Sequence, residues 1–147
     1  MRLSAKGEYA ITALLDLAMH DKEGLQPIQE IAARQGIPQR YLEQVLLQLK
    51  RAGLLESRRG SSGGYRLSRP ADQVTIGTVL RAVEDSVGGA GAARRGGAYG
   101  PDSMGDLSDL WREISEAVSA VVDRLTLDDL RRRAEDRRSK ASPMYHI

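Results

Sequence analysis

A glycine-rich stretch near the middle of the chain carries arginines suited to holding a polyanion. Arg58 and Arg59 precede Gly60, Ser61 and Ser62, and no acidic residue occurs from position 57 to 69. Positions 50 to 69 contain six basic residues and one acidic residue, whereas the net charge of the whole chain is only +2. Such a local basic patch on a nearly neutral protein indicates a polyanionic partner at one face. Solvated arginines on an ordinary surface hairpin are the alternative.

Side chains that can read nucleic-acid bases lie a few residues earlier. Gln39, Arg40, Glu43 and Gln44 fall on the outward face of a predicted helix, near its start. Arginine pairs with guanine, glutamine pairs with adenine, and glutamate accepts a hydrogen bond from the cytosine amino group. These types predict base contacts, with a solvated helix face as the alternative. Because phosphate repels a glutamate, Glu43 would act in selectivity.

Three predicted helices position these side chains. Apolar residues at helical spacing predict a core helix over residues 4–20. Near its start, Arg2 and Lys6 are candidates for contact with a phosphate backbone, or are simply solvated charges. A short helix over residues 27–36 and a second helix over residues 38–51 follow.

The second and third helices have the spacing of a helix-turn-helix motif. Ala32 allows close approach of the helices, Gly36 makes the turn, and Leu42 locks the following helix. Two short segments, 54–58 and 65–67, flank the glycine-rich loop and predict a β-hairpin. A hairpin directly after such a helix pair is the wing of a winged helix-turn-helix. The predicted fold class is therefore mainly α with a small β-hairpin wing.

Composition divides the chain into four predicted parts. Thr75 is expected to cap a fourth core helix, after which glycine dominates. A segment so poor in large apolar residues cannot bury enough surface to order itself. The predicted boundaries are a winged helix-turn-helix domain at 1–85, a flexible glycine-rich loop at 86–105, a dimerisation helix with a short following helix at 106–130, and a basic flexible tail at 131–147.

The long helix predicted over residues 106–125 carries a seam that indicates a homodimer. Its apolar residues are spaced 4, 3, 4, 3 and 4 apart, as in nearly three heptads of a coiled coil; they are Leu107, Trp111, Ile114, Val118, Val121 and Leu125. Packing within one chain is the alternative. The short helices of the domain offer little to cover so long a stripe, so we expect a homodimer on palindromic double-stranded DNA.

Several classes of protein are disfavoured by what the chain lacks. It has no cysteine, which excludes disulfides and thiolate metal sites. It has no apolar run near the ~20 residues of a membrane span and no signal-peptide pattern, so we expect a cytoplasmic protein without membrane contact. Its two histidines, His20 and His146, are far apart in sequence, and no catalytic motif accompanies them, so we expect no enzyme. A winged-helix module that binds only protein is a further alternative, but it would not require the basic excess.

The combined motifs resemble the IscR/CymR/NsrR-type family of bacterial winged-helix regulators over roughly residues 1–130. The matching segments are Met1–Ala10, Ile31–Ala32, Tyr41–Gln44, Gly53–Leu54, Ser57–Gly60, Gly63–Leu67 and Leu125–Leu130. The resemblance implies a dimeric, sequence-specific DNA-binding regulator, expected to be a repressor, with each wing reaching a minor groove through Arg59. The full set of expected DNA-contacting residues is Arg2, Lys6, Gln39, Arg40, Tyr41, Glu43, Gln44, Arg51, Arg58, Arg59, Gly60, Ser61 and Ser62.

The chain departs from the iron–sulfur members of this family in the loop that carries their three cysteines. The equivalent positions fall near Ala92, Ala98 and Met104. Cluster ligation needs thiolate or imidazole, so we expect no cofactor and no metal. Either the chain is naturally free of a cluster, like the cysteine-metabolism repressors, or it is a cluster sensor whose cysteines have been replaced. Methionine at the third position favours the first explanation.

The end of the chain also resembles that of the cysteine-metabolism repressors. Tyr145, His146 and Ile147 form an aromatic-then-isoleucine ending with a terminal carboxylate. Enzymes of cysteine synthesis bind such an isoleucine in their amino-acid site. The resemblance therefore implies O-acetylserine sulfhydrylase as a partner and sulfur metabolism as the regulated process; a terminus that happens to end in isoleucine is the alternative.

Overall fold

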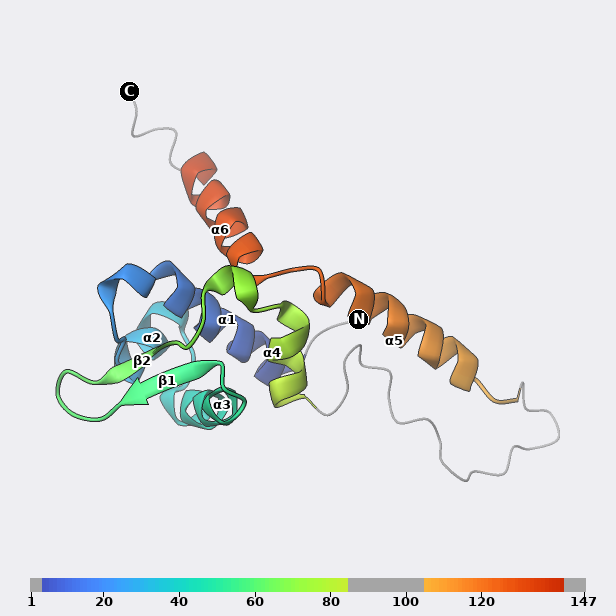
Figure 1. Ribbon diagram of the computed structural model, residues 1–147, viewed down its shortest axis with the longest axis horizontal. Coiled ribbons are helices and arrows are strands. Elements are labelled where there is room, and N and C mark those ends of the chain that lie inside the picture. The colour runs from blue at the N-terminus through green and yellow to red at the C-terminus, as the bar shows by residue number, and fades with distance from the viewer. Residues whose placement is uncertain (1–3, 85–104, 142–147) are drawn as a thin grey trace.

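A computed structural model describes residues 4–84 and 105–141 of the chain (Figure 1). Almost all of the predicted glycine-rich loop lies outside the described residues, as do Arg2 and the chain end at 142–147. The described part is helical apart from one two-stranded hairpin, which confirms the predicted fold class. The elements in order are α1 (Ala5–Met19), η1 (Asp21–Glu23), α2 (Ile28–Gln35), α3 (Gln39–Arg51), β1 (Leu55–Arg58), β2 (Gly64–Leu67), η2 (Ala71–Gln73), α4 (Ile76–Val83), α5 (Ser108–Val122) and α6 (Leu127–Ala141).

Local sequence signals set the ends of the helices much as expected. The hydroxyl oxygen of Ser4 accepts a hydrogen bond from the Gly7 amide at 3.0 Å, and that of Thr75 accepts one from Thr78 at 3.1 Å. Both satisfy first-turn amides that lack a helical partner. Gly36 ends α2 in the left-handed region, at φ 65°, where a side chain would be strained. The turn between α2 and α3 therefore depends on this glycine.

The core is aliphatic and centres on α1, which contacts α2, α3, α4 and α6. It is built mainly from leucine, isoleucine, valine and alanine, as the absence of phenylalanine requires. Its largest fully buried side chains are Leu14, Leu17, Ile31, Leu42, Leu46, Leu49, Leu54, Leu80 and Leu127. None of the described helices is long and apolar enough to cross a membrane.

One carboxylate, that of Asp16 on α1, is fully buried within this core and is neutralised by α2. Arg34 donates to it twice, from Nε at 3.0 Å and from an Nη at 2.7 Å, and Gln35 donates once at 2.8 Å. The same Arg34 nitrogen that lies 2.7 Å from Asp16 also lies 2.9 Å from the side-chain oxygen of Gln26. The hydrogen bond to Asp16 raises the pKa of the Arg34 guanidinium, against the opposing effect of its partial burial. The first two helices are therefore joined by a bidentate ion pair.

α5 leaves the domain through a joint with α4. An isolated antiparallel bridge pairs Thr75 with Thr126, and Arg81 forms a bidentate ion pair with Asp123 at 2.7 and 2.8 Å. The hydrogen bond from Arg81 lowers the pKa of the Asp123 carboxyl. A side chain at position 77 would overlap the Asp123 carboxylate, so Gly77 makes room for the joint. Beyond it, α5 projects from the domain (Figure 1).

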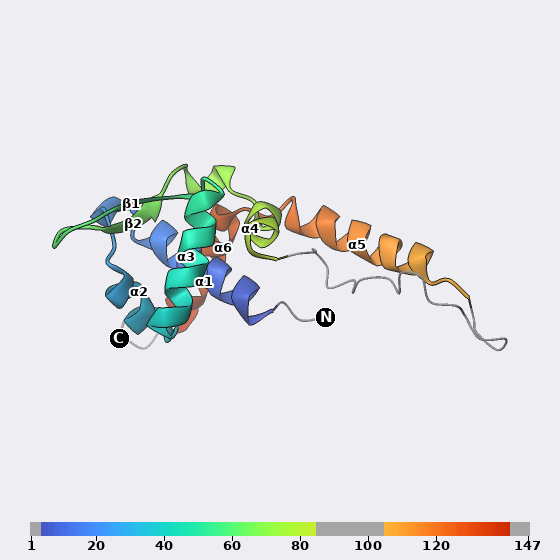
Figure 2. The same cartoon turned by 90° about the horizontal axis from the view of Figure 1, so that it is seen from below.

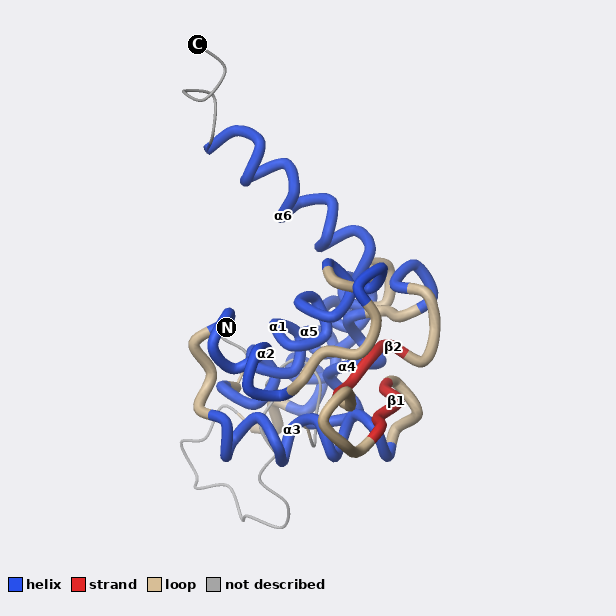
Figure 3. Tube along the Cα trace, turned by 90° about the vertical axis from the view of Figure 1, so that its left-hand side faces the viewer, coloured by secondary structure: helices blue, strands red, loops and turns tan. Residues whose placement is uncertain are grey.

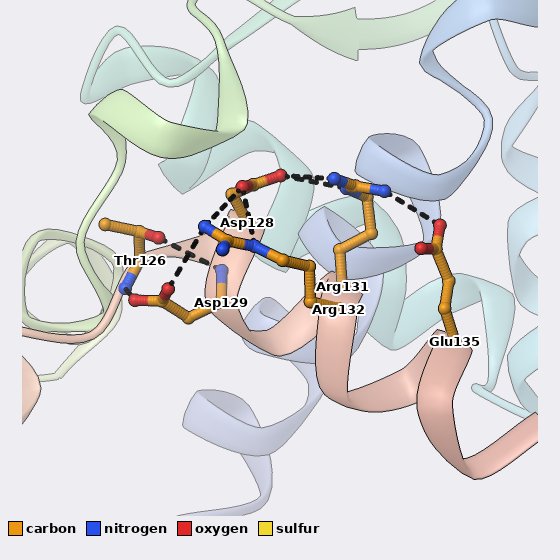
Figure 4. Close-up of polar contacts among 6 residues, drawn as sticks. All are labelled: Thr126, Asp128, Asp129, Arg131, Arg132 and Glu135. Carbon is orange, nitrogen blue, oxygen red and sulfur yellow. Dashed lines mark hydrogen bonds and ion pairs between the residues drawn. The ribbon is translucent and has the colours of Figure 1, made fainter.

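The last helix differs from expectation because residues 131–141, predicted as part of a flexible tail, are helical in α6. Thr126 and Asp129 form a reciprocal capping box, with hydrogen bonds of 3.0 and 3.1 Å. Arg131 then forms ion pairs with Asp128, three residues before it, and with Glu135, four residues after it, as Figure 4 shows. A hydrogen bond from Arg131 lowers the pKa of Asp128, and one from the Thr126 amide lowers that of Asp129. The charged residues predicted as a flexible tail thus form ion pairs that stabilise a helix.

The buried Arg34–Asp16 ion pair predicts how stability changes when one partner is removed. Replacing Arg34 with methionine keeps the length of the side chain but leaves the Asp16 carboxylate, whose side chain is 0% exposed, without its counter-charge. We expect a loss of about 3 kcal/mol in the free energy of unfolding, measured by urea denaturation. The matched control is Arg66→Met, which breaks the Arg66–Glu56 pair, whose side chains are 54% and 52% exposed, and should cost below about 1 kcal/mol. Equal losses in the two variants would contradict a special role for Asp16.

Candidate nucleic-acid interface

α3 presents an exposed, mostly polar stripe on the side opposite its buried face. The buried residues are Leu42, Val45, Leu46 and Leu49. With 3.6 residues per turn, the opposite stripe is formed by Arg40, Gln44, Leu47 and Arg51, all exposed. Because Leu42, Val45, Leu46 and Leu49 hold the helix to the core, this stripe needs no partner within the chain. α3 lies at one side of the domain and α6 points away at the other (Figures 1 and 3).

The first turns of α3 place most of the predicted base-reading side chains in solvent. Gln39, Arg40, Glu43 and Gln44 are exposed, and none forms an ion pair with another described residue. Tyr41 differs, because its ring packs edge-on against Tyr9 of α1 with the ring centres 5.2 Å apart, although it remains 37% exposed. Tyr41 therefore ties the start of α3 to α1 as well as facing solvent. Arg51, at the other end of the stripe, lies about 16 Å from Arg40 along the helix axis.

The wing is a short antiparallel hairpin that contacts α3 through β1. Its register pairs Leu55 with Leu67 and Arg58 with Gly64. The exposed tip carries Arg59, Gly60, Ser61 and Ser62, and Gly60 adopts φ 111°, which favours glycine. Arg58 and Arg59 form no ion pair with any other described residue, so both charges are available to a ligand. Arg66, in contrast, is held by Glu56 at 2.9 Å.

Gln26 fixes the position of the wing, a role that the sequence did not reveal. Its backbone forms an antiparallel bridge with Tyr65, through hydrogen bonds of 2.8 and 2.9 Å, and so extends the hairpin by one residue. A side chain on Gly64 would overlap the backbone of Gln26 and Pro27. The side chain of Gln26 accepts the hydrogen bond from Arg34 described above. The wing is thus connected through Gln26 and Arg34 to the buried carboxylate of Asp16.

A sequence signal for this network existed at Asp16 alone. An acidic residue stands there within the otherwise apolar run from Leu14 to Met19, where a charge needs a partner. Arg34 and Gln26 have no comparable mark, since both look like ordinary polar residues at helix and loop positions. Their role comes from the tertiary fold.

The start of α1 contains Lys6, a predicted phosphate contact, and is hydrogen-bonded to a carboxylate at the end of another helix, which was not predicted. Lys6 is half-buried on the first turn. Beside it, the hydroxyl of Ser4 donates a hydrogen bond of 2.5 Å to Glu84, which follows α4. A side chain at Gly7 would overlap that carboxylate. The beginning of α1 is therefore clamped to the end of α4, immediately before the part of the chain that is not described.

The predicted dimer seam lies on α5 and is largely uncovered in the single chain. Leu107, Trp111 and Val121 are 48, 39 and 45% exposed, and no residue of α5 is buried. Leu110 extends the exposed apolar surface, while Ile114 and Val118 are half-buried. Leu125 differs from the rest of the predicted seam, because it follows α5 and packs against the core of its own chain. The seam available to a partner therefore ends near Val121.

The residues of the chain do not fit an iron–sulfur cluster. No cysteine occurs anywhere in the sequence, and the positions equivalent to the cluster cysteines, near Ala92, Ala98 and Met104, lie outside the described residues. Among the residues that the structure describes, no three His, Asp or Glu side chains are grouped to hold a metal ion. His20 packs beside Asp16, with its Nδ1 2.7 Å from the Asp16 carbonyl oxygen. The described residues therefore offer no set of ligands for a cluster.

Known proteins are similar to this chain in both sequence and fold. Residues 3–133 match the Rrf2 family, described as iron-dependent transcriptional regulators. The HTH-type transcriptional regulator IscR of Pectobacterium carotovorum is 42% identical over 130 residues, which cover 88% of this chain and 79% of that protein. Two solved structures are similar. T. potens IscR matches with a TM-score of 0.74 and 33% sequence identity, over 92% of this chain and 90% of that chain. CymR of B. subtilis, described as the global cysteine regulator, matches with a TM-score of 0.70 and 32% sequence identity, over 89% of this chain and 96% of that chain. The chain therefore belongs to the Rrf2 family of transcriptional regulators, of the IscR and CymR type.

Proposed function

We propose that this regulator binds palindromic double-stranded DNA as a homodimer, reads its sequence with α3, and represses transcription. The observation that carries the proposal is the exposed stripe of α3, with its uncompensated Arg40 and Arg51, beside a wing whose Arg58 and Arg59 are also unpaired among the described residues. Base-reading side chains and phosphate-binding cations thus lie on neighbouring elements. A helix of this kind enters the major groove with its first turns nearest the bases.

Each element has a separate task in this mechanism. Arg40 and Gln44 bond to base edges in the major groove, and Glu43 selects against bases without an amino donor. Arg59 at the wing tip enters the neighbouring minor groove, where negative potential is strongest over A·T-rich sequence. Lys6, Arg51 and Arg58 contact phosphates, which position the protein without selecting sequence. The wing depends on Gln26 for its place beside α3, so this second contact is preset in the free protein.

The dimer is supported by the exposed apolar seam of α5. Scattered exposed apolar residues are normal, but a contiguous stripe on a projecting helix marks an interaction surface. A second copy presents the same stripe, so the two helices bury one another symmetrically. Since the chain lacks cluster ligands, control is exerted on this dimer by a small ligand or a protein partner with different affinity for its two states. The alternative is that the chain is a cluster sensor whose cysteines have been replaced, and this alternative predicts the same DNA contacts.

Two arginine substitutions separate base reading from minor-groove contact. Arg40→Ala should relax the choice at one base pair by about 1–3 kcal/mol, because a bidentate contact to a base edge is lost. Arg59→Ala should weaken binding mainly at operators with an A·T-rich narrow minor groove. The operator is found by selecting bound genomic fragments, and affinities are then measured by fluorescence anisotropy on specific and random duplexes over a range of salt concentration.

The matched control is Arg137→Ala, which removes the same charge from exposed α6 on the side of the domain away from α3. It should leave specific and random binding unchanged. Equal losses for Arg40→Ala on both duplexes would make Arg40 a phosphate contact. Wild-type affinity for random duplex that does not fall with salt would contradict DNA binding and favour a protein-interaction module.

The dimer proposal predicts the effect of a charge in the seam. Ile114→Asp or Val118→Asp places an unpaired carboxylate in the apolar interface, so each variant should sediment as a monomer and lose operator affinity. Ala120→Asp, on the opposite face of the same helix, is the control and should remain dimeric. The operator should have half-sites about one helical turn, ~10 bp, apart or a multiple of that. A wild-type chain that sediments as a monomer at micromolar concentration would falsify the dimer.

We further propose that the regulated genes serve sulfur metabolism. The similarity to CymR, which is described as a cysteine regulator, and the ending Tyr145-His146-Ile147 support this assignment; the ending lies outside the described residues. Calorimetry should detect binding to O-acetylserine sulfhydrylase that O-acetylserine displaces. Deletion of Ile147 or amidation of its carboxylate should abolish that binding, because the enzyme site recognises a free terminal carboxylate. Absence of displaceable binding by the intact chain would remove this partner.

A further inference from the structure

Leu47 is an apolar side chain in the middle of the polar stripe of α3. It is 46% exposed, three residues after Gln44 and four before Arg51, so one helical turn separates it from each. The core-facing side of α3 is already filled by other residues, all of them buried. Leu47 therefore contributes little to the fold of its own chain, and α3 keeps a leucine where its outward face is otherwise polar.

Exposure of one leucine is not by itself a sign of function. The neighbours of Leu47 are what distinguish it. The other exposed large apolar residues of the described chain are Tyr41, which packs on Tyr9, and a group formed by Leu107 at the N-cap of α5 and by Leu110, Trp111 and Val121 within it. Figure 2 shows α3 and the projecting α5 as separate parts of the molecule. Leu47 thus belongs to no larger apolar patch of the kind that binds another protein.

The stripe that surrounds Leu47 limits what it can meet. If Arg40 and Gln44 read bases, then Leu47 on the same stripe also faces the base edges. Most groups that base pairs present in the major groove are hydrogen-bond donors or acceptors, and the one apolar substituent is the C5 methyl group of thymine. An apolar side chain there gains from contact with that methyl and loses from desolvating any other edge.

We propose that Leu47 is a specificity-determining residue that selects thymine in each half-site through its methyl group. The inference rests on the proposed reading of DNA by α3 and adds to it a base contact of a different chemical kind. Three residues of helix advance about 4.5 Å along the axis, and base pairs are spaced about 3.4 Å apart. The selected thymine therefore lies one or two base pairs from the base read by Gln44.

The test removes the methyl group from the DNA and the leucine from the protein, separately and together. Each thymine of the selected operator is replaced in turn by deoxyuridine, which keeps its hydrogen bonds and lacks the methyl. Each half-site should contain one thymine whose replacement matters, because its buried methyl group is lost. Replacement of that thymine in one half-site should lower the affinity of the wild-type dimer about fourfold, and replacement in both half-sites should lower it about fifteenfold. Leu47→Ala should lose affinity for the thymine operator and respond less than twofold to the same replacement.

Controls separate this contact from general effects on binding. Lys50→Ala, also exposed on α3, should weaken the thymine and deoxyuridine operators alike. Deoxyuridine outside the half-sites should have no effect. A wild-type protein indifferent to every replacement, a Leu47→Ala variant as sensitive as wild type, or half-sites without thymine would each overturn the inference while leaving DNA reading by α3 intact. Equal wild-type affinity for selected and random duplexes would instead refute the proposed function, and the inference with it.

Discussion

The buried carboxylate of Asp16 is the constraint on which the geometry of the interface depends. A charge in an aliphatic core is tolerated only when its partners surround it, and here those partners come from α2. Arg34 satisfies both oxygens of Asp16 and also holds Gln26. Gln26 in turn pairs with Tyr65 of the wing. The contacts around this one buried charge thus fix the positions of α1, α2 and the wing relative to one another.

The second fixed point is the joint between the domain and α5. The Arg81–Asp123 pair is exposed, so, like most surface pairs, it contributes little to stability. The stronger restraints are the backbone bridge between Thr75 and Thr126 and the complete burial of Leu127. Glycine at position 77 leaves room for the Asp123 carboxylate, which a side chain there would displace. In the proposed dimer this joint sets the angle of α3 relative to the partner, and hence the spacing of the half-sites.

The sequence predicted the parts of this fold that depend on local chemistry. The helix cap at Thr75, the turn at Gly36 and the hairpin follow from short-range rules, and the structure confirms each. The family resemblance is confirmed by the comparisons. The length of α6 was missed, because stabilisation by Arg131 with Asp128 and Glu135 looks in sequence like a solvated charged tail.

The parts that could not be predicted depend on contacts between distant residues. Nothing local marks Arg34 or Gln26 as partners of Asp16, since the three come together only after the helices pack. Leu47 was missed for a related reason: a leucine on a helix is ordinarily assigned to the core. Only when Leu42, Val45, Leu46 and Leu49 are seen to fill the inner face does Leu47 become a surplus apolar residue. An interface that reads DNA needs hydrogen-bonding groups for most bases and an apolar group for the thymine methyl, and the stripe of α3 carries both.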